Sequence, residues 1–185
     1  QNRVYPKGIA CFSEHYGNLM GNRGCLHDGD KNIIRNHKGK RWIYCRLRFR
    51  DVQRKVMSPG RYTELFFLDE FTAMSAGHRP CGTCMPQKLK DFLRFWRMGN
   101  DRPTYNLVEI DGFLHRERLS GPVFLNKPFD TLPEGAFLKN GKTYYAKNNS
   151  YLLPWDFKGY GAPQDFDHQT DYELVTPPSI VNALN

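Results

Sequence analysis

The sequence lacks any long apolar run, and this absence excludes a membrane-spanning helix, which needs about 18 consecutive apolar residues. Mean hydropathy is −0.66. Residues 1–10 lack the apolar core of a secretory signal peptide. The chain also has neither a Gly-rich phosphate-binding loop ending in Lys-Ser/Thr nor a Gly-x-Ser-x-Gly motif. We therefore expect a soluble, cytoplasmic protein that does not contact membranes.

Cysteine is scarce, and the five cysteines are an odd number that cannot all pair. No evenly spaced set of partners suggests a disulfide framework. Two of them form the single Cys-x-x-Cys motif, Cys81-Gly82-Thr83-Cys84. In a reducing compartment this pattern favours metal binding over disulfides.

Positive charge, by contrast, is abundant and unevenly distributed over the 185 residues. The net charge is +8, and residues 1–60 carry 13 Lys and Arg against 4 Asp and Glu, whereas residues 120–185 carry 5 against 7. Phosphates attract such a surface, so the imbalance favours nucleic acid, and we expect DNA, as the partner. The alternative is a solvated surface that only aids solubility.

The hydrophobic pattern predicts an α+β fold in two parts. Residues 1–119 are expected to form a basic, zinc-anchored module of strands and helices, and residues 120–185 a small antiparallel β meander. Asn140-Gly141 lies between two short apolar runs, which is a strong hairpin signal. Pro177-Pro178 is expected to end regular structure. Further elements are a strand at 41–49, helices at 64–76, 86–98 and 105–119, and a strand at 151–155.

The Cys81/Cys84 turn has the geometry of a zinc knuckle, because two thiolates in this spacing can bind one tetrahedral Zn²⁺. The stretch from Phe67 to Cys84, which ends in Ser75-Ala76-Gly77-His78-Arg79-Pro80-Cys81-Gly82-Thr83-Cys84, resembles the zinc-binding module of Ada-type DNA repair proteins. In that module a short helix ends in a small residue and Gly, and an aromatic residue and Arg-Pro-Cys-x-x-Cys follow. The resemblance implies a four-ligand zinc site beside a DNA-contacting surface, in a repair, modification or defence setting.

The sequence departs from that family upstream of the helix. The family has a Cys-x-x-x-Cys pair there, one of whose cysteines accepts methyl groups from DNA phosphotriesters. Here Phe49 stands four residues after Cys45, so this activity is not carried over, and His78 replaces the aromatic residue. Strand alternation points Cys45 inward, which makes it the expected third ligand. His27 is the preferred fourth ligand, with Cys25 as the alternative.

The other face of the predicted strand at 41–49 is the expected nucleic-acid-binding surface. Aromatic rings stack on bases, and arginines neutralise phosphates. The alternative is that a helix covers this face and its aromatic residues belong to the core. The face presents Trp42, Tyr44, Arg46, Arg48 and Arg50, and Lys38, Lys40, Arg54 and Lys55 extend the basic zone.

A zinc-dependent hydrolase, deaminase-like or a nuclease, is the alternative function. Nucleobase deaminases combine His-x-Glu with Pro-Cys-x-x-Cys, and this chain contains His115-Arg116-Glu117 as well as Pro80-Cys81-x-x-Cys84. The order is reversed, however, and residues two apart in a helix point about 200° from each other. His115 and Glu117 are therefore either the catalytic pair of such a site or ordinary residues at the end of a surface helix. Asp28 and Asp30 offer a hard-metal site for a nuclease, although turn chemistry explains them equally well.

Overall fold

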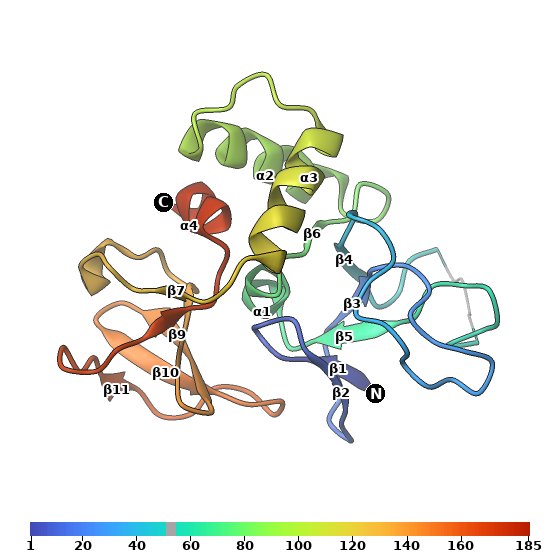
Figure 1. Cartoon of the computed structure of the whole chain (residues 1–185), viewed down its shortest axis with the longest axis horizontal. Helices are drawn as coiled ribbons and strands as arrows, with labels where there is room; N and C mark the ends of the chain where they lie inside the picture. The colour runs from blue at the N-terminus through green and yellow to red at the C-terminus, as the bar shows by residue number, and fades with distance from the viewer. Residues whose placement is uncertain (51–54) are drawn as a thin grey trace.

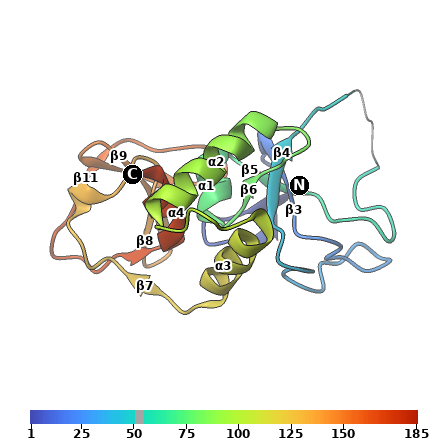
Figure 2. The same cartoon turned by 90° about the horizontal axis from the view of Figure 1, so that it is seen from above.

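The chain folds into two β-sheets with helices packed between and above them. The structure is a computed structural model that describes residues 1–50 and 55–185. Figures 1 and 2 show the sheets on opposite sides of the molecule, with α1 (Glu70–Ser75) and α4 (Pro178–Leu184) between them. The predicted α+β class is confirmed. None of the helices in the described part of the chain has the length and apolar character that crossing a bilayer requires.

The first sheet is built from residues 2–80 and has the order β2-β1-β5-β3-β4-β6. Its neighbours pair antiparallel, except for β1 with β5 and β4 with β6, which are parallel. The parallel pair β4/β6 matters for the site, because it sets the start of the Cys-x-x-Cys turn beside β4. The strands are β1 (Asn2–Val4), β2 (Ala10–Phe12), β3 (Leu19–Asn22), β4 (Ile43–Arg46), β5 (Leu65–Phe67) and β6 (Arg79–Pro80).

The second sheet is antiparallel and has the order β11-β10-β9-β8-β12-β7. The predicted Asn140-Gly141 hairpin is present, with Asn140 opposite Thr143, and Gly141 has φ +54°, which suits glycine. The predicted strand at 151–155 is also confirmed. The strands are β7 (Val123–Phe124), β8 (Phe137–Asn140), β9 (Thr143–Asn148), β10 (Tyr151–Trp155), β11 (Gln164–Asp165) and β12 (Glu173–Leu174).

The helices agree with the sequence in part. α2 (Pro86–Gly99) begins with proline in its first turn and buries Phe92 and Trp96 one turn apart. α3 (Leu107–Leu119) begins with a capping box. The expected helix at 64–76 was wrong in its first half, which is strand β5. Pro177-Pro178 was also misread, because Pro178 starts α4 rather than ending regular structure.

The two sheets share part of one core. Leu68 beside β5 and Tyr5 beside β1 pack with Phe137 and Trp155 of the second sheet. Two of the helices are also joined to each other: Trp96 of α2 donates its indole N–H to Ser179 Oγ of α4 at 3.1 Å. The change from one sheet to the other falls between α3 and β7, near the predicted boundary at 119/120.

Candidate metal centre and the basic residues around it

Three buried cysteines from distant parts of the sequence meet at one point. The thiols of Cys45, Cys81 and Cys84 all lie within 4.8 Å of one another, close enough to hold a metal ion. Each side chain is less than 9% exposed. The predicted grouping of Cys45 with the Cys-x-x-Cys turn is therefore present in the fold.

Backbone pairing explains why the three sulfurs converge. Cys45 is on β4, whose Tyr44 lies opposite Pro80 of β6. The amide of Cys81 then donates to the carbonyl of Tyr44 at 2.9 Å, which places the turn beside Cys45. Cys84 ends the turn two residues before α2. A strand, a turn and a helix start are thus joined at the thiols.

The electrostatics of the three thiols differ. Burial raises the pKa of Cys45, and the neighbouring Cys81 and Cys84 raise it further. Burial opposes ionisation of Cys81 as well, but hydrogen bonds from the amides of Cys84 and Thr83 outweigh it and lower the pKa of that thiol. Burial also raises the pKa of Cys84. Amides that donate to the first sulfur of a Cys-x-x-Cys turn favour the thiolate form that binds metal.

The expected fourth ligands lie elsewhere. His27 Nδ1 is 2.6 Å from Thr63 Oγ1, and Cys25 Sγ is 3.6 Å from the carbonyl oxygen of His27. Among the described residues, no fourth His, Cys, Asp or Glu joins the cluster of the three thiols. His27 is instead held in a small bridge with Ile33, so the loop folds back on itself rather than over the thiols.

A cavity of about 350 Å³ opens beside the thiols. All three cysteines line it, together with Glu64, Met20 and Phe66. Glu64 is buried, and its Oε2 accepts a hydrogen bond from the amide of Met57 at 2.8 Å. Sequence reasoning missed Glu64, because an isolated glutamate before a strand gives no local signal of its position relative to Cys45.

The His115/Glu117 pair is not assembled around the thiols. Both residues lie within α3, and the His115 ring packs 4.9 Å from the His37 ring. Glu117 accepts from the backbone amide and the hydroxyl of Ser179, at 2.9 and 2.5 Å, and burial raises its pKa. The structure therefore gives Glu117 a packing role at the start of α4.

The residues of the predicted outward strand face differ in their exposure: the aromatic residues are buried and the cations are exposed. Trp42 and Tyr44 are buried, contrary to expectation, because helices cover this side of β4. Beyond β4 the strand alternation no longer applies: Leu47, which a longer strand would place on the same side as Cys45, is half exposed. Four of the expected cations are exposed, as predicted: Lys40, Arg46, Arg48 and Arg50. Arg54 lies outside the described residues.

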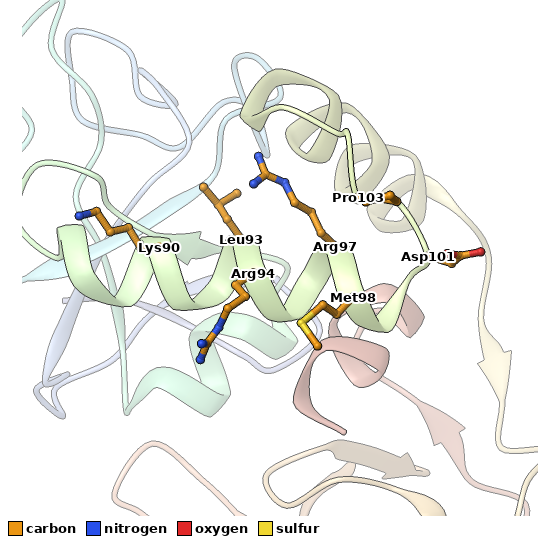
Figure 3. Close-up of a pocket in the computed structure, with 7 residues that line it drawn as sticks. All are labelled: Lys90, Leu93, Arg94, Arg97, Met98, Asp101 and Pro103. Atoms are coloured by element: carbon orange, nitrogen blue, oxygen red, sulfur yellow. The ribbon is translucent and has the colours of Figure 1, made fainter.

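A second group of cations follows the thiols on α2. A cavity of about 440 Å³ lies along this helix. Figure 3 shows its lining residues, with Arg97 pointing toward α3 and Arg94 pointing away from it. Arg97 Nε donates to the carbonyl of Tyr105 at 2.7 Å, which is a structural contact. The lining side chains do not converge on one ligand, so we interpret this helix face as a basic surface. Lys90 and Arg94 are its exposed cations.

Comparison of the chain with protein-family models, with curated proteins and with solved structures finds no match.

Proposed function

We propose that this chain binds Zn²⁺ through Cys45, Cys81 and Cys84 and binds DNA through the exposed cations that flank them. The observation that carries the proposal is the convergence of three buried thiols. Thiolates in a tetrahedral set favour zinc among the common metals, and a Cys-x-x-Cys turn is a frequent source of two such ligands.

The position of the basic residues supports the DNA-binding part. Arg46 and Arg48 directly follow the ligand on β4, and Lys90 and Lys88, the latter paired with Glu70, follow the ligand that precedes α2. A metal that fixes β4 against the start of α2 therefore also fixes these two groups of cations relative to each other. Such fixed charges neutralise phosphates without further loss of chain entropy.

Metal analysis tests the zinc part. We expect about one zinc per chain, and a loss of zinc in C45S, C81S and C84S. The matched control is C11S, because Cys11 is half buried and lies outside the cluster. The H27Q and C25S variants are expected to keep their zinc. Full zinc retention by C45S would contradict the ligand set.

A salt series with fluorescently labelled duplex DNA tests the second part. The double variant R46A/R48A is expected to bind roughly tenfold more weakly at 0.1 M salt and to lower the slope of log K against log[salt] by about 2. The control K142A/K158A removes the same charge from exposed positions in the β8–β9 turn and in the loop after β10. Equal losses in both variants would mean that net charge alone attracts DNA, and the proposal would fail.

A zinc-dependent hydrolase is the second candidate, and one observation favours it. Three protein ligands beside an open cavity are typical of catalytic zinc sites, in which the metal lowers the pKa of a bound water. In this chain Glu64 lines that cavity and carries the carboxylate that would take up a proton from such a water.

Turnover of single-stranded DNA, RNA, cytidine and adenosine by the zinc-loaded protein tests this candidate. If one is hydrolysed, E64Q is expected to lower the rate at least about 100-fold while retaining zinc, whereas E117Q is expected to keep the rate. Turnover that survives E64Q, or no turnover of any of the four, would rule out this role of Glu64.

A further inference from the structure

A separate cavity of about 310 Å³ lies beside Trp42 and shares no lining residue with the thiol cavity. Its walls come from the segment around Lys7, from the end of α3 and from residues 173–178. Two arginines, Arg23 and Arg118, line it beside Trp42. The proposed DNA surface uses none of these residues.

Arg23 is a buried cation with an unused donor. Its side chain is only 2% exposed. Nε donates to His78 Nε2 at 3.0 Å and Nη1 to the carbonyl of Gly8 at 2.7 Å. Nη2 has no hydrogen-bond acceptor among the residues that the structure describes. A buried donor without an acceptor costs about 1–3 kcal/mol, so an acceptor supplied from the cavity would stabilise Arg23 in this position.

Arg118 is a second guanidinium that has only backbone partners. Nε and Nη2 donate to the carbonyl of Gly77, and Nη1 donates to the carbonyl of Lys40 at 2.9 Å. Within residues 1–50 and 55–185, neither Arg23 nor Arg118 forms an ion pair with a carboxylate. Burial lowers the pKa of each to about 9, so both stay charged at neutral pH.

Trp42 holds the two guanidiniums in place. The Cζ atom of Arg23 lies 4.0 Å from the centre of its ring, and that of Arg118 lies 4.4 Å from it. Cation–π contacts of this kind orient guanidiniums without neutralising them. The buried position of Trp42 therefore has a use that its predicted exposure did not suggest.

The carboxylates of the cavity are already engaged. Glu117 accepts two hydrogen bonds from Ser179, and Glu173 pairs with Lys7 at 2.5 Å and with Lys139 at 3.7 Å. In the described part of the chain, neither guanidinium of the cavity forms a direct ion pair, although the charges of Asp111 and Glu117 act on Arg118 at longer range. A dianion with several acceptor oxygens fits this donor set best, because guanidinium donors match phosphate oxygens in geometry.

We infer that the cavity formed by Arg23, Arg118 and Trp42 binds a phosphate monoester group. The phosphate is carried either by a small metabolite or by the 5′ end of a nucleic acid. The volume exceeds that of a phosphate alone, which leaves room for the carrier.

Calorimetric titration with inorganic phosphate at constant ionic strength tests the inference, with acetate as the control anion. Phosphate is expected to bind and to raise the melting temperature, and acetate is not. R23K keeps the charge but loses the unused donor, so at least about tenfold weaker binding is expected. K7M changes an exposed side chain that lines the cavity and replaces R23K as the test if R23K does not fold. It is expected to bind phosphate about threefold more weakly. The matched control R94Q, on the outer face of α2, is expected to bind phosphate normally.

Equal effects of phosphate and acetate, or equal weakening in R94Q and in the cavity variants, would overturn the inference. Two oligonucleotides, with and without a 5′ phosphate, identify the carrier when tested in the R46A/R48A background. A preference for the phosphorylated end assigns nucleic acid, and equal binding assigns a small molecule. Failure of the DNA surface would leave phosphate binding unchanged, so the two proposals are tested separately.

Discussion

His78 is a fully buried histidine held in one protonation state. Its Nε2 accepts from Arg23 Nε, so Nδ1 carries the proton and donates to the carbonyl of Ala76 at 3.2 Å. Burial lowers its pKa well below the usual value, and the charges of Arg23 and Arg118 lower it further. A group of this kind binds its proton more readily in the unfolded chain.

The stability of the protein should consequently fall on acidification. Below about pH 6.5 the unfolded state takes up a proton at His78 that the folded state refuses, so unfolding becomes more favourable by about 1 kcal/mol at pH 5.5 relative to pH 7.5. Urea unfolding at the two pH values measures this. H78Q removes the titrating group, and the loss on acidification should be smaller by that amount. An unchanged pH dependence in H78Q would contradict the assignment.

Single residues also show where sequence reasoning succeeds. Cys81 and Cys84 could be identified from their spacing alone, and Cys45 from the alternation of one strand. Trp42 and Tyr44 were misplaced, because alternation assumes that one side of the strand faces solvent. The helices that cover that side come from residues far along the chain, and the sequence around Trp42 contains no signal that predicts this contact.

At the scale of elements, a buried ion pair joins β6 to α3. Arg79 Nε donates to Asp111 Oδ1 at 2.7 Å and Arg79 Nη2 donates to Oδ2 at 2.8 Å. Both side chains are less than 10% exposed. This pair orients the strand that leads directly into Cys81, so it helps to hold the Cys-x-x-Cys turn in position.

Replacing one partner should therefore be costly. D111N leaves the charge of Arg79 buried and unmatched, and we expect a loss of about 3 kcal/mol in the free energy of unfolding. The control is E70Q, which removes the more exposed pair between Glu70 and Lys88 and should cost less than about 1 kcal/mol. Urea denaturation of both variants gives the comparison. Losses of similar size would show that burial of the Arg79 pair is unimportant.

Elements with strong local signals were predicted well. The α2 stripe, the capped α3 and the Asn140-Gly141 hairpin all carry their information within a few residues. The expected helix at 64–76 failed because Leu65, Phe66 and Phe67 form a run that suits a buried strand as well as a helix. Its pairing with β1 and β3 decides the matter, and that pairing is not local.

At the scale of the whole molecule, one node ties the two sheets together. Asp69 caps α1 by accepting from the amide of Thr72 at 2.8 Å, and its other oxygen accepts from Tyr160 Oη at 2.6 Å. Trp155 donates its indole N–H to Thr72 Oγ1 at 3.2 Å. The start of α1 in the first half of the chain is thus held by the second sheet. From the sequence, Asp69 can be recognised as a helix-capping residue, but its hydrogen bond to the distant Tyr160 cannot be predicted.

The candidate sites follow the same rule. The thiol centre joins Cys45 to a turn 36 residues further along the chain, and the arginine cavity joins Arg23 to Arg118, 95 residues away. The pattern of the chain could therefore suggest their chemistry but not their assembly. The cations at positions 40, 46, 48 and 50 are exposed as predicted, whereas the nucleic-acid partner inferred from the charge distribution stays a prediction. The buried arginines Arg23 and Arg118 escaped notice, because in sequence they look the same as the exposed ones.

The three clustered sulfurs have one more consequence, which concerns oxygen. Each thiol has two others as its nearest reaction partners, so a two-electron oxidant can join any two of them and leave the third as a lone sulfur. Air and metal then compete for the same atoms. The grouping that makes Cys45, Cys81 and Cys84 good ligands also makes them a site of oxidative damage whenever neither metal nor reductant protects them.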